Sequence, residues 1–198
     1  MANVSAVKAK FFEPQGVSAA LVSASASAAT LVIADGGPYG NLTETITLYS
    51  SGNNSGNTFT ITGTDGNGDA QTEDVTGPTA GATVNSANKY LTVTSIVSDG
   101  AIVSDIQAGI LGTGALTGTV FAGRTRIRGL TGTSKASAGN IVFKNTSITG
   151  TSLLTIPLTG AVSSIDPYVP DNGVLFDAGA YVNLTAADVT GVTVYYDG

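Results

Sequence analysis

The chain has 198 residues, 8 of them Lys or Arg and 14 Asp or Glu, which gives a net charge of −6 at neutral pH. It contains no His, Cys or Trp, which excludes disulfides, thiolate metal sites and nucleophile systems of the Ser-His-Asp or Cys-His type. The acidic balance argues against nucleic acid and anionic membranes as partners, because attraction to phosphate supplies most non-specific affinity for nucleic acid.

The first fifteen residues are expected to form an N-terminal arm. Its apolar side chains include the adjacent pair Phe11 and Phe12, which would be costly to leave in water. The arm is therefore a candidate anchor on a partner, with Val4 and Val7 as further apolar contacts. Segments at chain ends that lack strong local structure often order on a partner.

The segment from Val17 to Ile33 is rich in Ala and Ser. Its Ser content is too high for a membrane-spanning helix, and Glu13 and Pro14 stand where the apolar part of a signal peptide would begin. Secretion by a signal peptide is therefore not expected. Ser18 to Ala29 is the one stretch that is compatible with a helix, although Ser disfavours it.

Three stretches between residues 42 and 96 alternate apolar residues with Thr: Leu42–Tyr49, Thr58–Gly63 and Tyr90–Ile96. A period of two with Thr on the wet face predicts half-buried strands of an antiparallel sandwich. In the third stretch the alternation groups Leu91, Val93 and Ser95 on one face and places Ile96 on the other. Gly, Asn and Asp clusters between the stretches predict tight turns.

Asp65, Asn67 and Asp69 are spaced two apart, as the first ligands of a calcium loop would be. A helix-flanked calcium loop also needs Gly at position 6 and Glu at position 12, where this chain has Ala70 and Thr76. The same residues form a standard hairpin turn, in which Gly and Asn adopt positive φ. The sequence favours the turn, so neither a metal site nor a cofactor is predicted.

All three arginines of the chain, Arg124, Arg126 and Arg128, lie two residues apart. A strand would place them on one face, with Thr125 and Ile127 opposite. Arginine favours bidentate contacts with carboxylates, so one interpretation is an interface with an acidic surface of a neighbouring copy or another protein. The alternative is a solvated strand face on which charge protects an edge from aggregation.

Further strands are expected at 124–130, 140–144, 152–157, 173–176, 181–185 and 192–196. Tyr195 and Tyr196 would point to opposite faces of the last strand, so one interpretation is that at least one is exposed and available for an interface. The alternative, which the usual intermediate burial of Tyr favours, is a Tyr half-covered by a neighbouring loop. Asp166, Asp171 and Asp177 lie in a turn-rich segment. They are the only candidate acid–base group, and we expect no enzymatic activity because Asp-Pro and Asp-Asn-Gly are ordinary turn sequences.

The expected fold class is all-β, with an antiparallel β-sandwich domain at residues 16–122 followed by a smaller β-sandwich or β-barrel-like domain at 123–198. The boundary lies in the Gly-rich run 109–123, which could equally supply a strand.

Two stretches resemble modules of tailed-bacteriophage virion proteins. One is FTITGTDGNGDAQTEDVTGP, from Phe59, followed by GATVNSANKYLTVTSI, from Gly81. The other is similar to small β-domains of phage structural proteins, in which a GVLF segment, here Gly173 to Phe176, precedes a final VTVYY strand. Together the two resemblances cover most of residues 40–198.

The resemblance implies a non-enzymatic structural protein that joins the virion in the host cytoplasm. Its expected partners are other virion proteins, above all the major capsid protein, and further copies of itself. Decoration of the capsid surface is the first hypothesis, and a neck, tail or fibre component is the second. A bacterial surface adhesin is the third, although it would be expected to carry a signal peptide and complete calcium loops.

Overall fold

The computed structural model describes residues 6–14, 18–25, 30–31, 41–112 and 114–198, and all regular structure in these ranges is β. Every pairing between strands is antiparallel. The predicted all-β, antiparallel fold class is therefore confirmed. No helix that is long and apolar enough to cross a membrane occurs in the described ranges.

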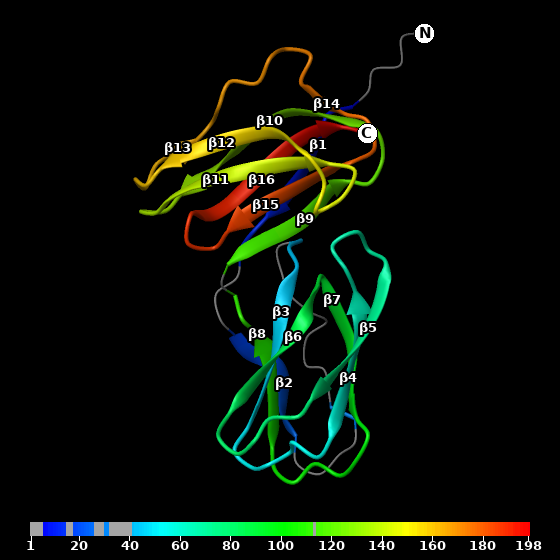
Figure 1. Ribbon diagram of the computed structural model, residues 1–198. Helices are drawn as coiled ribbons and strands as arrows, with labels where there is room; N and C mark the ends of the chain where they lie inside the picture. Colours follow the sequence, from blue (N-terminus) through cyan, green and yellow to red (C-terminus); the bar gives the residue numbers. More distant parts are fainter. Residues whose placement is uncertain (1–5, 15–17, 26–29, 32–40, 113) are drawn as a thin grey trace. The chain divides into compact units, whose positions relative to one another are not determined.

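The chain folds as two compact units (Figure 1). Unit 1 comprises residues 1–14, 40–42 and 113–198, and unit 2 comprises residues 15–39 and 43–112. The N-terminal segment thus belongs to the same unit as the C-terminal half of the chain.

Unit 1 is a sandwich of two sheets. The first sheet has the order β1-β16-β10, and the far edge of β10 pairs with both β13 and β14. The second has the order β12-β11-β15-β9. The strands are β1 (Lys8–Phe12), β9 (Ala115–Phe121), β10 (Thr125–Ser134), β11 (Ala138–Asn145), β12 (Ser152–Thr159), β13 (Ser164–Ile165), β14 (Val174–Phe176), β15 (Ala180–Thr185) and β16 (Val189–Asp197).

One apolar core lies between these two sheets. Phe12, Ile127 and Val194 reach it from the first sheet, and Leu116 and Phe143 reach it from the second. All five are at most 1% exposed, so both sheets depend on the same buried contacts for their stability.

Unit 2 contains a sheet of order β2-β8-β3-β6 and a sheet of order β5-β4-β7. Its strands are β2 (Ser18–Ser25), β3 (Glu44–Ser50), β4 (Thr58–Thr64), β5 (Ala70–Thr76), β6 (Thr83–Tyr90), β7 (Thr92–Ser98) and β8 (Ile106–Ile110). The predicted alternation holds in β3 and β4, where Ile46, Leu48, Phe59 and Ile61 are fully buried. These side chains meet residues of β7 and β8 in a second apolar core.

The stretch Tyr90–Ile96 departs from its prediction. It is divided between β6 and β7, and both Val93 and Ile96 are buried. The reason is a bulge in β7: Gly63 pairs with Val93 and Thr62 pairs with Ser95, so Thr94 is an extra residue. A bulge resets the alternation, and two apolar residues three apart can then face the same core.

The expected division into domains also differs from the two units. β1 pairs with β16, and β9 pairs with β15, so hydrogen bonds tie both strands to the C-terminal unit. The Gly-rich run supplies the end of β8 and the whole of β9, which places the break between the units at residues 112–113 rather than near 122. The stretch considered as a helix contains β2 up to Ser25, and residues 26–29 lie outside the described ranges.

The position of β1 in unit 1 leads to a prediction about two adjacent Phe residues. Phe12 is fully buried and Phe11 is 48% exposed. Phe12→Ala should lower the free energy of unfolding by about 3–5 kcal/mol, because it leaves a cavity in the core. Phe11→Ala should cost about 1 kcal/mol or less. Urea unfolding of the full chain, followed by circular dichroism, measures both, and equal losses would contradict the placement of β1.

Candidate interaction surfaces

The predicted alternation of the arginine segment is confirmed in β10. Thr125 and Ile127 are buried, whereas Arg126 and Arg128 are partly exposed. Arg124 is exposed and directly precedes the strand. β10 pairs with β16 on one side and, along Thr125–Ile127, with β14 on the other, so neighbouring strands fix the backbone beneath the arginines.

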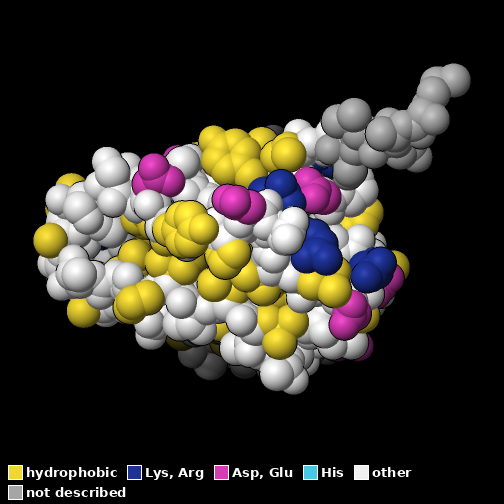
Figure 2. Space-filling model, turned by 90° about the horizontal axis from the view of Figure 1, so that it is seen from above, with side chains coloured by type: hydrophobic (Ala, Val, Ile, Leu, Met, Phe, Trp, Pro, Cys, Tyr) yellow, Lys and Arg dark blue, Asp and Glu magenta, His cyan; other side chains and the backbone are white. Residues whose placement is uncertain are grey.

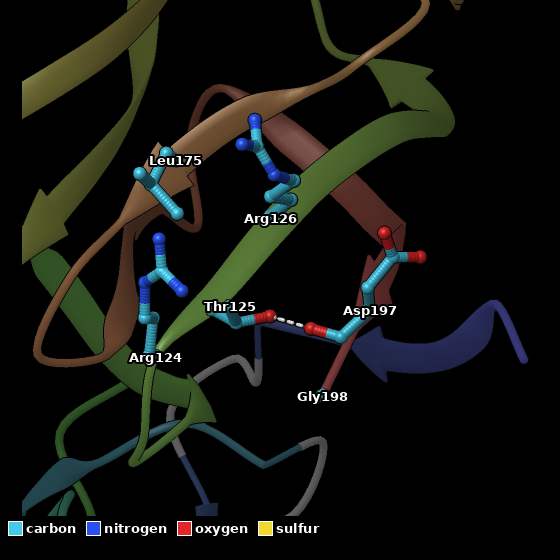
Figure 3. A pocket seen from close by; sticks show the side chains of 6 residues that line it. All are labelled: Arg124, Thr125, Arg126, Leu175, Asp197 and Gly198. Atoms are coloured by element: carbon cyan, nitrogen blue, oxygen red, sulfur yellow. Dashed lines mark hydrogen bonds between the residues drawn. The ribbon is translucent and has the colours of Figure 1, made fainter. Parts of the chain in front are cut away.

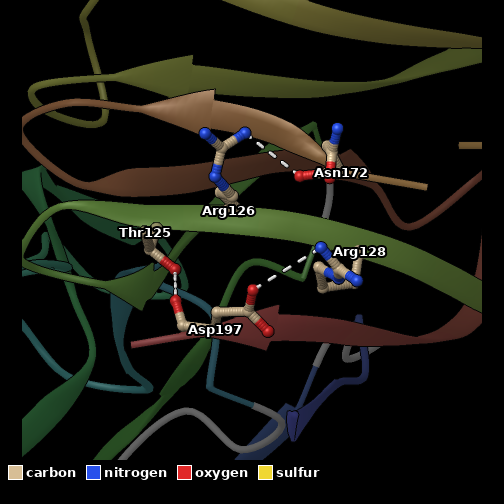
Figure 4. A network of polar contacts seen from close by, with 5 residues as sticks. All are labelled: Thr125, Arg126, Arg128, Asn172 and Asp197. Atoms are coloured by element: carbon tan, nitrogen blue, oxygen red, sulfur yellow. Dashed lines mark hydrogen bonds and ion pairs between the residues drawn. The ribbon is translucent and has the colours of Figure 1, made fainter. Parts of the chain in front are cut away.

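Each arginine has a different partner, and Figure 4 shows the contacts of Arg126 and Arg128. Arg128 lies 3.7 Å from the Asp197 carboxylate, and Arg126 donates a hydrogen bond of 3.1 Å to the backbone carbonyl of Asn172. Arg124 lies 3.7 Å from Asp177, and both of these side chains are at least 70% exposed. Ion pairs this exposed contribute little. Within the described ranges, Arg126 forms no ion pair.

An open cleft of about 260 Å³ lies beside Arg124 and Arg126. Leu175, which pairs with Arg126 across β14 and β10, forms its apolar wall (Figure 3). Thr125, Asp197 and Gly198 complete the lining, and the Thr125 hydroxyl donates to the backbone carbonyl of Asp197. Two guanidinium groups beside one apolar wall suit a carboxylate borne on a short aliphatic chain.

The turn before β14 allows this strand to approach β10 closely. Gly173 has a φ of +67°, and a Cβ at this position would lie 2.5 Å from the Ile127 carbonyl oxygen. Only glycine suits both conditions. Leu175 and Asn172 were not predicted as site residues, because the register of β14 against β10 is not encoded in local sequence. The GVLF segment, residues 173–176, was the one feature of the sequence that drew attention to this part of the chain.

The two C-terminal tyrosines are both half-buried. This agrees with the alternative of a half-covered Tyr and not with a fully exposed one. Tyr196 packs against the core of unit 1 and against Phe121, with ring centroids 5.9 Å apart. Tyr195 lies over the opposite side of β16, where its hydroxyl is 3.4 Å from that of Thr131. Of the pair, Tyr195 is the one beside the arginines.

The adjacent residues Phe11 and Phe12 are likewise divided between two faces of the sheet. Phe12 is in the core, so it is not available to a partner. The ring of Phe11 covers Gly191, where an added Cβ would lie 2.7 Å from the ring. It borders a groove of about 390 Å³ that is also lined by Glu13 and by Thr residues of β10 and β16.

Of the other apolar residues of the predicted arm, Val7 is 55% exposed, and Val4 lies outside the described residues.

Four of the seven predicted interface residues therefore share the outer side of one sheet: Phe11, Arg126, Arg128 and Tyr195. Cross-strand pairs set this arrangement. Phe11 pairs with Thr193, and Arg126 pairs with Asp197. We call these four residues, together with Leu175, the arginine face. Lys8 and Lys10 alternate to the other side of β1, where Lys10 donates to the Thr119 carbonyl, so the cations of this face are arginines.

The Asp65–Asp69 segment is a hairpin turn between β4 and β5. The Asp65 carboxylate accepts hydrogen bonds from the backbone N–H groups of Asn67 and Asp69, at 2.8 and 3.0 Å. Gly68 has a φ of +89°, as such a turn requires. The described residues contain no cluster of three or more metal-ligating side chains.

The three carboxylates considered for acid–base chemistry, Asp166, Asp171 and Asp177, are all exposed. Asp177 is the partner of Arg124. None of the three lines the cleft beside the arginines.

Charge is divided unequally between the two units. Unit 1 holds seven of the eight Lys and Arg residues and six of the fourteen carboxylates, a net charge of +1. Unit 2 holds the remaining Lys and eight carboxylates, a net charge of −7. Figure 2 shows Lys and Arg side chains gathered toward one end of the visible face, among Asp, Glu and apolar side chains.

Unit 2 also contains a buried carboxyl group, that of Glu44 at the start of β3. The side chain is 1% exposed, and its Oε1 has no hydrogen-bond partner within the described ranges. Burial raises the pKa of this carboxyl to about 7, opposed by the charge of Lys89 and by a hydrogen bond from the Gly112 backbone. A group of this kind weakens the fold whenever it is ionised.

No protein-family model matches this chain, and no curated protein sequence matches it. Among solved structures, the chain is similar to one described as "Crystal Structure of the STIV MCP", at 10% sequence identity over 96% of each chain and with a TM-score of 0.25. A TM-score this low leaves the function of the chain to be argued from its own residues.

Burial of Glu44 predicts that stability falls as the pH rises. Its pKa is higher in the folded chain than in the unfolded chain, so the folded state binds more protons between pH 4.5 and 7. The free energy of unfolding should therefore decrease by about 2 kcal/mol from pH 5 to pH 8 on account of this group. Glu44→Gln should remove that slope in urea unfolding, whereas Asp105→Asn, at an exposed carboxyl, should leave it. An unchanged slope in Glu44→Gln would contradict the assignment.

Proposed function

We propose that this protein is a non-enzymatic structural component of a tailed-phage particle, bound to the head surface through contacts that include the arginine face. The sequence resemblance over residues 40–198 supports the virion role. The observation that carries the proposed contact is that four predicted interface residues, from three strands, share one side of one sheet.

The arginine face combines the features of an interface that binds through a few strong contacts. Phe11 offers exposed apolar surface, and Tyr195 offers a ring with a polar end. Arg126 has N–H groups left over after its bond to Asn172. Aromatic residues and arginine are the types that carry most binding energy at interfaces. The proposed partner is the major capsid protein, and many copies on one shell would add modest individual contacts into a large effect.

A second candidate function is a neck, tail or fibre component that contacts sugars, and the groove beside Phe11 favours it. The groove brings together an aromatic ring, the carboxylate of Glu13 and the hydroxyls of Thr131, Thr133 and Thr193. An aromatic face with several hydroxyl and carboxylate partners suits a neutral sugar ring. This function would place few copies on each particle.

Immunogold labelling of purified phage particles distinguishes these functions. With an antibody to this protein, we expect gold distributed over the whole head, because decoration requires a copy near each group of capsid subunits. Particles treated with pre-immune serum are the control.

Gold at one vertex or along the tail would overturn head decoration in favour of the neck, tail or fibre role. Particles without gold, despite a positive immunoblot of infected cells, would contradict the virion role altogether. A bacterial surface adhesin would then be the leading hypothesis.

A further inference from the structure

We infer that the cleft beside Arg124 and Arg126 binds the β4–β5 hairpin of a second copy of this chain, so that copies join head to tail. This inference rests on the proposed function, for which it names one partner of the arginine face. The hairpin, which we call the acidic hairpin, carries Asp65, Asp69, Glu73 and Asp74.

The unequal division of charge is the first observation behind this contact. The arginines lie in the unit of net charge +1, and the acidic hairpin lies in the unit of net charge −7. Two copies can therefore bring opposite charges together by placing unit 2 of one against unit 1 of the other.

The arginines of the cleft are available for such a partner. Arg126 forms no ion pair within the described ranges and uses one N–H group on the Asn172 carbonyl. Among the described residues, Arg124 is held by Asp177 alone, at 3.7 Å and in solvent. An incoming carboxylate could accept two parallel hydrogen bonds from Arg126, a stronger arrangement than an exposed single contact.

The acidic hairpin presents a carboxylate that its own turn does not use. Asp65 accepts backbone N–H groups within the turn, Glu73 accepts those of Ala87 and Asn88, and Asp74 accepts the Thr60 hydroxyl. Asp69 is exposed, and no described residue donates to its carboxylate. Asp69 is thus the side chain at the hairpin end best placed to enter the cleft.

The cleft has room for this contact. Its volume of about 260 Å³ exceeds that of one carboxylate side chain, and the Leu175 wall can cover the aliphatic part. The contact joins two different surfaces, so it is heterologous, and each added copy leaves a free cleft and a free hairpin. Repetition then gives rings or open chains, a geometry suited to covering a shell.

Sedimentation velocity of the purified full chain tests the contact. From 10 µM to 1 mM protein in 20 mM NaCl, the weight-average sedimentation coefficient should rise with concentration. In 500 mM NaCl it should return to the value of a single chain, because salt screens the exposed charges. Arg126→Glu and Asp69→Arg should each weaken self-association at least tenfold.

Mixing the two variants tests the head-to-tail arrangement itself. Arg126→Glu retains the acidic hairpin, and Asp69→Arg retains the cleft, while the two changed residues form a reversed pair with each other. An equimolar mixture should therefore regain the self-association that each variant alone has lost. The double variant carries the reversed pair and should regain self-association. Lys144→Glu in β11 and Asp105→Arg in unit 2 make the same charge changes elsewhere and should behave as the unmodified chain.

Three results would overturn the inference. A single chain at every concentration in 20 mM NaCl would exclude the contact, without affecting the immunogold result on which the proposed function depends. A mixture of the two variants that stays monomeric would exclude the head-to-tail pairing. Loss of association in the two control variants would show that net charge, rather than this cleft, governs it.

Discussion

The pairing of β10 with β16 is the interaction on which the rest of unit 1 depends. It turns Ile127, Leu130 and Val194 into the core and turns Arg126 and Tyr195 outward. Ile127 pairs with Tyr196 and Gly129 pairs with Tyr195, so Arg128 lies between them as an additional residue of β10 with no pairing position on β16. This bulge lets Ile127 and Leu130, three residues apart, both reach the core. One register thus fixes both the packing and the arginine face.

Much of the fold follows from the sequence, because alternation of apolar residues with Thr is a local property. Apart from β13, which was not predicted, the strands from residue 124 onward lie at the predicted ranges, as do β3 and β4. The division of Tyr90–Ile96 was missed because the alternation gives no sign of a bulge. The two bulges share a sequence feature. In both β7 and β10, two buried apolar residues lie three positions apart, with the extra residue of the bulge between them.

The candidate site was less predictable, since it depends on pairings between strands far apart in the chain. The arginine spacing predicted one exposed face of β10, but not Leu175, which β14 contributes. The assignment of Phe12 to a partner was wrong, because local sequence could not reveal that β1 pairs with β16 and buries Phe12 in the core. The unequal charge of the two units could be seen only once their boundaries were known.

We propose that the arginine face holds the protein on the particle. The most direct test is to count copies per particle, relative to the major capsid protein, in phage that encode Arg126→Glu. Quantitative mass spectrometry should find at least tenfold fewer copies than in unmodified phage. Phage encoding Lys144→Glu, changed on the other sheet of unit 1, should keep the normal number. Equal copy numbers in all three, with the Arg126→Glu protein folded and as stable as the unmodified chain, would contradict the claim.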